Sequence, residues 1–299
     1  MSTDLNVSFN EQFANINNKL KKRFMRKPNL SEATNEFKAL AIQCENAEQP
    51  SFAGQCYIGA AKCEATAGHS AGEAEYYVAA ARQYMIAEKK MHSLKFGSFD
   101  RENLESAIGC FLQALSKYPE KSPLRTAVYL ELASDLVLLN LKREALHYYE
   151  QALEVIDSKM VELMCLRTLC NLQIECGLYD IALTNANKIA DGDLTVPEDT
   201  LSEVQVNRIL LALIVQPEEE CRPKSLDNLL QQLLSDKDKI DIPISTDLRI
   251  KLQSIIVSYR TSDSAVLVKL AADCKPFLNT QQRGLLETIV AQDRQAAFE

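Results

Sequence analysis

The sequence predicts an all-α fold, a right-handed α-solenoid of stacked helical hairpins with about fourteen helices. Apolar residues recur at i, i+3, i+4 and i+7 almost everywhere, as in Leu130, Ala133, Leu136 and Val137, and this spacing marks one face of an α-helix. No segment alternates between apolar and polar residues as a half-buried strand does. Only 9 Gly and 9 Pro occur in 299 residues, which leaves few turns for an all-β fold.

Proline and glycine divide this pattern into helix-sized pieces, and several boundaries carry a capping residue. Asn29 or Ser31 precedes an acidic first turn and is a candidate N-cap. Pro123 follows Ser122, and proline suits a first helical turn because the N–H there has no partner. Two further candidate N-caps are Asp263 and Asn279. The dividing positions are Pro28, Pro50, Gly68 to Gly72, Gly97, Pro119, Pro123, Gly177, Gly192, Pro197, Pro217, Pro223 and Pro243.

A degenerate internal repeat supports the solenoid. Ala74, Ala107, Ala145 and Ala182 lie 33, 38 and 37 residues apart. A small residue that lets two helices approach, followed by a larger one that fills the groove, is the second-helix pattern of a tetratricopeptide repeat. Spacings longer than 34 residues indicate a divergent version. The predicted repeat-packing residues are Ala74, Ala81, Ala107, Phe111, Ala114, Ala145, Tyr149, Ala152 and Ala182.

The pattern divides the chain into four parts. An N-terminal basic segment, 1–29, leads into the first helices, and tetratricopeptide-like repeats cover 30–191. A loop at 192–197 contains Gly192 and Pro197. Beyond it, 198–299 remains amphipathic and is expected to continue the solenoid. The helical segments expected there are Leu201 to Val215, Leu226 to Leu234, Leu248 to Tyr259, Ala265 to Cys274 and Thr280 to Gln292.

Composition and charge exclude several classes of protein. No apolar run approaches the roughly 18 residues of a membrane span, and Asp4 and Glu11 interrupt the first twenty residues, so we expect no signal peptide and a cytoplasmic location. The formal net charge is -8 and the pI about 5.2. Because phosphate contacts need positive surface, we expect no nucleic-acid partner.

We expect no catalytic, metal or cofactor site. The nine cysteines contain no C-x-x-C pair and are predicted to be small, reduced core residues. His69, His92 and His147 stand alone, without the i+4 partner of a helical metal pair. Phosphate-binding loops and a nucleophile elbow are also missing from the sequence. The sequence therefore predicts an interaction protein rather than an enzyme.

A basic segment before Pro28 is the sharpest local feature, with six cations inside nine residues. Leu20 and Phe24 are four residues apart, on one helical face. Such a segment suits docking on an acidic partner, contact with anionic lipid, or nuclear import. An ordinary helix end, whose late positive charges favour the helix dipole, explains it equally well. The candidate partner contacts are Lys19, Lys21, Lys22, Arg23, Phe24, Arg26 and Lys27.

The stretch Asn18 to Asn29, NKLKKRFMRKPN, resembles the near-N-terminal signature of the 40-kDa huntingtin-associated proteins. The segments Gln205 to Gln216 and Phe277 to Val290 look similar to the same family, with looser correspondence between these islands. Mammalian members carry a small-residue-rich N-terminal extension and a long proline-rich insertion near the 192–197 loop. Both are short or missing here, which suggests an invertebrate-type orthologue.

The resemblance implies a non-enzymatic subunit that forms a heterodimer with huntingtin, held between huntingtin's helical-repeat domains and stabilising it. It also implies a link to the Rab5 GTPase and early endosome motility, so early endosomes and a nuclear pool join the expected cytoplasmic location. An alternative is a vesicle-trafficking adaptor that resembles the soluble attachment proteins of the membrane-fusion machinery, whose helical arrays carry runs like Ala74 to Tyr84.

Overall fold

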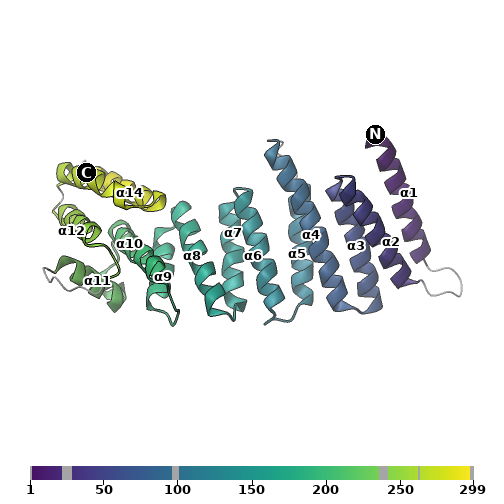
Figure 1. Cartoon of the computed structure of the whole chain (residues 1–299), viewed down its shortest axis with the longest axis horizontal. Coiled ribbons are helices and arrows are strands. Elements are labelled where there is room, and N and C mark those ends of the chain that lie inside the picture. Colours follow the sequence, from purple (N-terminus) through teal and green to yellow (C-terminus); the bar gives the residue numbers. More distant parts are fainter. Residues whose placement is uncertain (1, 22–28, 96–100, 236–241, 262, 297–299) are drawn as a thin grey trace. The chain divides into compact units, whose positions relative to one another are not determined.

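The computed structural model describes residues 2–21, 29–95, 101–235, 242–261 and 263–296 (Figure 1). Within these ranges the chain forms fourteen α-helices, two short 3-10 helices and no strand. The predicted all-α class is confirmed. None of the helices found in these ranges combines the length and apolar character needed to cross a membrane.

The helices follow one another with short connections. In chain order they are α1 (Ser2–Leu20), α2 (Leu30–Asn46), α3 (Pro50–Ala67), α4 (Ser70–Ser93), α5 (Glu102–Lys117), α6 (Pro123–Leu138), α7 (Lys142–Val155), α8 (Lys159–Glu175), α9 (Tyr179–Asp191), α10 (Glu198–Val215), η1 (Glu219–Cys221), α11 (Lys224–Leu234), α12 (Thr246–Arg260), α13 (Ser264–Cys274), η2 (Lys275–Phe277) and α14 (Thr280–Ala296).

The chain consists of two compact units. Unit 1 covers Met1–Val155 with α1 to α7, and unit 2 covers Ile156–Glu299 with α8 to α14. The sequence-based division into 1–29, 30–191, 192–197 and 198–299 follows the repeat pattern rather than compactness, and it stays a prediction.

Four helices begin where the sequence predicts a cap. Asn29, Ser122, Asp263 and Asn279 each accept a hydrogen bond from a backbone N–H of the following turn, with donor–acceptor distances of 3.2, 3.3, 3.2 and 2.8 Å. Such bonds satisfy donors that the helix itself leaves unpaired. Pro123 occupies the first turn of α6, as predicted.

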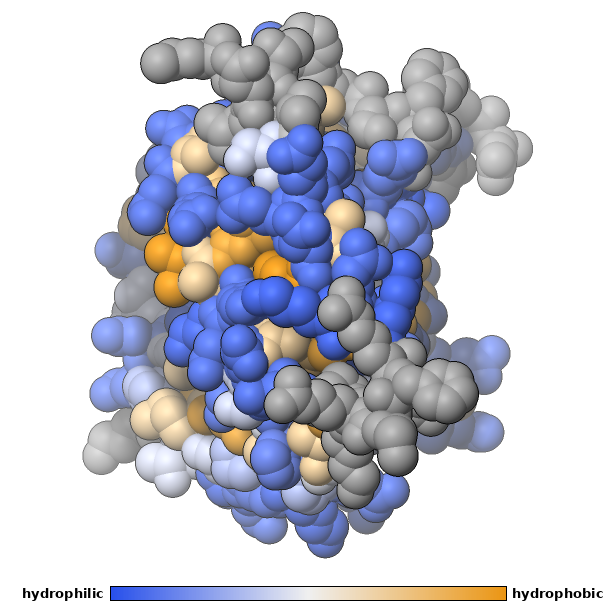
Figure 2. All heavy atoms as spheres, turned by 90° about the vertical axis from the view of Figure 1, so that its right-hand side faces the viewer, coloured by the Kyte–Doolittle hydropathy of each residue, from blue (hydrophilic) through white to orange (hydrophobic). Residues whose placement is uncertain are grey.

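The α1 helix covers one end of unit 1. The Phe9 ring stacks 4.4 Å from Phe52, and the Phe13 ring lies 5.4 Å from Phe37, centroid to centroid. Most of the remaining described side chains of α1 are polar and exposed. Viewed from this end, the surface is mostly hydrophilic, with several small hydrophobic patches between the polar side chains (Figure 2). α1 thus packs its aromatic side chains against α2 and α3 and leaves a largely polar outer face.

Inside unit 1, glycines let neighbouring helices approach closely. A Cβ at Gly54 of α3 would lie 2.8 Å from the Tyr84 ring of α4, and one at Gly59 would lie 2.8 Å from the Phe37 ring of α2. α3 therefore packs tightly between α2 and α4. The α6/α7 hairpin continues the unit.

The order of helices corrects one part of the predicted repeat. Ala74 lies in α4 and Ala107 in α5, yet both positions were assigned to second helices of successive repeats. Only residues 94–101 separate these two helices, which is too short for an intervening first helix. α4 and α5 pack directly against each other. Both helices supply small residues to a close helix–helix contact, so spacing alone could not tell a first helix from a second.

Unit 2 also departs from a simple continuation of the solenoid. In a solenoid each repeat contacts only its neighbours, whereas α14 packs across α10 and reaches α8 as well as α13. Gln281 Nε2 donates to the Asn171 carbonyl of α8 (2.9 Å), and Gln282 Nε2 donates to Asn207 Oδ1 of α10 (3.0 Å). Gln282 and Asn207 are both buried. Burial of these polar groups requires partners, and the fold-back of α14 supplies them.

A second buried polar group, here called the Arg208 cluster, joins α9, α10 and α11. Arg208 is only 2% exposed. Its guanidinium donates to Asn187 Oδ1 (2.7 Å), Gln205 Oε1 (3.0 Å) and Ser225 Oγ (2.7 Å), and lies 3.6 Å from Asp191 Oδ1. Burial lowers the pKa of Arg208, and the Asp191 carboxylate opposes that shift.

Candidate partner-binding site

Of the predicted partner contacts, Lys19 and Lys21 lie in the part of the chain that the structure describes. Lys19 Nζ pairs with Glu36 of α2, and this hydrogen bond raises the pKa of Lys19. Lys21 is exposed. Lys19 therefore helps to join α1 to α2, in addition to any contact with a partner. The other predicted contacts, Lys22, Arg23, Phe24, Arg26 and Lys27, lie outside the described residues.

The predicted repeat-packing residues all lie in the interior. Each side chain is buried within its own unit. Apart from the correction at Ala74, their assignment to tetratricopeptide-type repeats stays a prediction. The buried residues are Ala74, Ala81, Ala107, Phe111, Ala114, Ala145, Tyr149, Ala152 and Ala182.

One face of unit 1 brings together every second helix, and we call it the α2–α4–α6 face. Its first contacts join α2 to α4. Gln83 Nε2 donates to Glu45 Oε1 (2.8 Å), and Lys90 Nζ donates to Glu48 Oε2 (3.1 Å). Glu45 also accepts a hydrogen bond from Tyr57 (2.9 Å). These contacts hold the C-terminal halves of α2 and α4 side by side.

The next contacts on this face join α4 to α6. The Arg82 guanidinium donates two hydrogen bonds to the Glu131 carboxylate, at 2.6 and 2.8 Å, and Lys89 Nζ donates to Asp135 Oδ1 (2.5 Å). The hydrogen bond that Arg82 donates to Glu131 raises the pKa of Arg82. A bidentate arginine–carboxylate pair fixes orientation better than a single contact. The pairs therefore set the spacing of α4 and α6.

Exposed apolar side chains accompany these charges. Ile42 of α2, Ile86 of α4 and Leu138 of α6 are 43%, 49% and 66% exposed. Ile42 and Leu138 each lie three residues from an acidic residue of the face, and Ile86 lies three and four residues from two of its bases, so helical spacing places all three on it. A hollow of about 360 Å³ adjoins Ile86. Apolar groups exposed on one face and rimmed by polar groups mark a candidate protein-binding surface.

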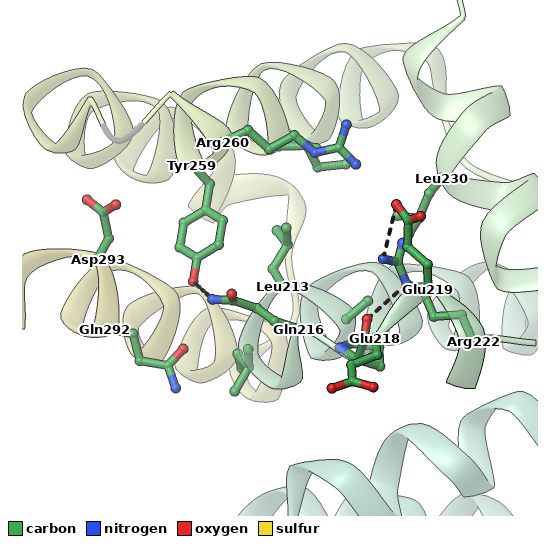
Figure 3. Close-up of a pocket in the computed structure, with 14 residues that line it drawn as sticks. Leu213, Gln216, Glu218, Glu219, Arg222, Leu230, Tyr259, Arg260, Gln292 and Asp293 are labelled. Carbon is green, nitrogen blue, oxygen red and sulfur yellow. Dashed lines mark hydrogen bonds and ion pairs between the residues drawn. The ribbon is translucent and has the colours of Figure 1, made fainter. Parts of the chain in front are cut away.

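Unit 2 carries a larger hollow of about 770 Å³ between α10, η1, α11, α12 and α14 (Figure 3). Leu213 and Leu230 contribute to its apolar lining. Gln216 Nε2 donates to Tyr259 Oη (2.5 Å), and the two side chains point toward each other across the hollow (Figure 3). The hollow thus has an apolar lining and a polar bridge between α10 and α12.

The charges around this hollow are mixed. Arg222 Nε donates to the Pro217 carbonyl (3.0 Å), and its terminal nitrogens lie 3.4 Å from Asp227 and 3.9 Å from Glu219. Arg260 lines the hollow as well and forms no ion pair with any residue that the structure describes. Positive and negative side chains therefore both surround the hollow, and neither sign predominates.

Candidate metal ligands do not gather in the described ranges. No group of three His, Cys, Asp or Glu side chains there is placed to hold a metal ion. The His69 ring lies 3.0 Å from the Glu64 carboxylate. All nine cysteines are free thiols, and seven are buried. Burial raises the pKa of the Cys165 thiol to about 12, which keeps it protonated and a poor nucleophile.

Sequence reasoning missed the α2–α4–α6 face. Apolar residues at helical spacing were all interpreted as core residues. Ile86 and Leu138 fit that spacing closely enough that the sequence does not mark them as exposed. The charged pairs join residues 42 to 49 positions apart, beyond the reach of a motif. A charged residue three or four positions from an apolar residue, which shares a helical face with it, was the available signal.

Comparison with known proteins gives one related group. No family model matches the chain. Over 80 residues it is 38% identical to the 40-kDa huntingtin-associated protein of Rattus norvegicus and, equally, to that of Mus musculus. The chain is a partial homologue of these proteins. The matched stretch is 27% of this chain and spans about a fifth, 21%, of each relative.

The comparison therefore confirms the predicted resemblance in a coarser form. A family relationship holds over the matched stretch, and full-length correspondence to the relatives does not follow from it. Assignment as an invertebrate-type orthologue stays a prediction.

Proposed function

We propose that this chain is a non-enzymatic interaction protein that binds huntingtin. The observation that carries the proposal is the 80-residue similarity to two huntingtin-associated proteins at 38% identity. The name of those relatives states an association with huntingtin, and a shared stretch of this length is a reason to expect the same partner here.

The architecture supports an interaction role. Stacked helices present long faces on which a large partner can make many contacts. Unit 1 offers such a face, with Ile86 and Leu138 exposed among charges that are already paired. Truncating exposed apolar anchors of this kind typically weakens a protein interface more than truncating rim charges does.

The finer parts of the proposal rest on sequence resemblance. They are a heterodimer in which this chain is held between huntingtin's helical-repeat domains and stabilises it, a link to the Rab5 GTPase in early endosome motility, and a cytoplasmic location with endosomal and nuclear pools. The basic residues Lys19 to Lys27 belong to the same proposal, as contacts with the partner.

Co-expression with huntingtin from the same organism, followed by size-exclusion chromatography, tests the proposal. We expect one stoichiometric complex and a higher unfolding temperature for this chain in the complex, because a ligand that binds only the folded state stabilises it. Two separate peaks, with this chain folded and monomeric, would contradict the proposal. Binding to assembled membrane-fusion complexes in the same assay would then favour the trafficking adaptor.

A further inference from the structure

We infer that the α2–α4–α6 face of unit 1 is the docking surface for an amphipathic helix of the partner protein, with Ile42, Ile86 and Leu138 as its apolar contacts. The inference rests on the proposed function, because it takes huntingtin as the source of that helix. It adds the surface of this chain that is used and the kind of element that occupies it.

Unit 2 contains an intramolecular example of such docking. Arg167 of α8 and Glu203 of α10 pair at 2.5 Å, just as Arg82 and Glu131 join α4 to α6 in unit 1. In unit 2 a helix lies against this pair of alternate helices. Asn279, at the start of α14, donates to Glu203 Oε1 (3.3 Å). Two alternate helices of this chain thus form a surface on which a third helix packs.

The manner in which α14 sits on α8 and α10 defines the expected ligand. Leu285, Leu286 and Ile289 are at most 1% exposed, and their spacing of three to four residues forms one apolar stripe. Polar contacts at the helix start, from Gln281 and Gln282, fix the register. A helix with aliphatic residues at this spacing and a polar first turn can pack in the same way on a surface of alternate helices.

In unit 1, no helix of the described residues packs on the α2–α4–α6 face in this way. Ile86 and Leu138 keep 49% and 66% of their surface exposed, whereas the apolar stripe of α14 is buried against its neighbours. Burial of exposed apolar area is the main favourable contribution to association. Ile86 and Leu138 are therefore free to contact an apolar stripe of a partner helix.

The charges of the face point to an apolar anchor rather than a charged peptide. Arg82 and Lys89 pair with acidic residues of α6, and Lys90 pairs with Glu48 in the turn after α2. A strongly basic or acidic ligand would have to compete with these pairs. Docking through this face should therefore depend weakly on salt, whereas salt would screen the attraction between an acidic partner and the positive charges at 19–27.

The test measures huntingtin affinity of the full chain by biolayer interferometry, at low and high salt. The variant is the double substitution Ile86→Asp with Leu138→Asp. Leu112→Asp is the matched control, because Leu112 lies on α5 of the same unit, outside this face, and is 46% exposed. Circular dichroism verifies that all three proteins remain helical.

We expect the double variant to lose at least about tenfold in affinity, the ordinary cost of truncating a central apolar anchor, while the control changes less than about twofold. Wild-type affinity should change little with salt. Equal binding by the double variant and the wild type would overturn this inference and leave the proposed function intact. If the wild-type chain itself fails to bind huntingtin, both are overturned.

A photo-crosslinking residue at position 86 identifies the occupant in the same complex. We expect crosslinks to one helical segment of huntingtin with aliphatic residues three to four positions apart. Crosslinks to a loop, or to a second copy of this chain, would overturn the assignment of the occupant. A wild-type dimer in light scattering that becomes monomeric in the double variant would have the same consequence.

Discussion

Replacing Arg208 by alanine tests whether the Arg208 cluster holds α9, α10 and α11 together. The guanidinium is the shared donor of the cluster, with three hydrogen bonds of 2.7 to 3.0 Å to Asn187, Gln205 and Ser225. Alanine leaves these acceptors without their donor and removes the cation beside Asp191. The substitution also opens a cavity where a nearly fully buried side chain stood.

The expected loss of unfolding free energy follows from the burial of Arg208 and the partial exposure of Asp191. Removing one partner of a buried ion pair costs roughly 3 to 5 kcal/mol. Because the Asp191 side chain remains 35% exposed, water partly solvates the carboxylate that is left behind, and we expect the lower end, about 3 kcal/mol. For a domain of this size that corresponds to a fall in unfolding temperature of roughly 6 to 12 °C.

Hydrogen exchange measured by mass spectrometry locates the effect, because a whole-chain spectroscopic signal reports both units at once. We expect faster exchange in α9, α10 and α11 of the Arg208→Ala variant and unchanged exchange in α2 to α4. Urea unfolding followed by far-UV circular dichroism gives the free energy. Arg208→Met restores volume without hydrogen bonds, so it should lose less than alanine if the cavity contributes.

Arg260→Ala is the matched control, because Arg260 is an exposed arginine of the same unit. An exposed charge contributes at most about 1 kcal/mol, so the control should unfold close to the wild type. If Arg208→Ala lowers the free energy of unfolding by no more than Arg260→Ala does, the cluster does not stabilise unit 2 and the reasoning is refuted.

Three further predictions concern packing, thiols and pH. Gly59→Ala should cost about 1 to 3 kcal/mol in urea unfolding, because the new Cβ meets an aromatic ring at 2.8 Å; Gly109→Ala, which points into open space, should instead stabilise by up to about 1 kcal/mol. In the folded chain a thiol reagent at pH 8 should modify exposed Cys221 first, and equally fast modification of buried Cys165 would contradict the structure. Burial raises the pKa of Cys165 and Tyr84 to about 12, from 9.0 and 10.0, so the unfolded chain loses these protons at lower pH than the folded chain. The stability these groups contribute is therefore full below pH 9 and is lost toward pH 12, and a urea midpoint that rises between pH 8 and pH 10.5 would be the wrong sign.

Local chemistry explains which elements could be predicted from the sequence. The caps at Asn29, Ser122, Asp263 and Asn279 depend on contacts within three residues, and all four form as expected. The placement of α14 depends on hydrogen bonds between residues 75 to 110 positions apart, such as Gln281 with the Asn171 carbonyl. No periodicity encodes such a pairing.

The candidate site divides in the same way. The positive charges at 19–27 are close together in the sequence and can be recognised there. The α2–α4–α6 face can be recognised only when it is known which helices lie next to each other. Arg82 and Glu131 are 49 positions apart, and their pairing follows only once α4 and α6 share a face. The repeat assignment at Ala74 failed for the same reason, because an alanine-rich contact looks alike on a first and on a second helix.

The sequence by itself determined the helical class, the number of helices and most of their boundaries, because apolar period, proline and capping act over a few residues. The tertiary structure decided which helices are neighbours, which apolar residues remain exposed, and where α14 lies. Those features depend on the packing of surfaces from distant segments, since the burial of Gln282 against Asn207 and the exposure of Ile86 are properties of the assembled fold rather than of any local stretch of chain.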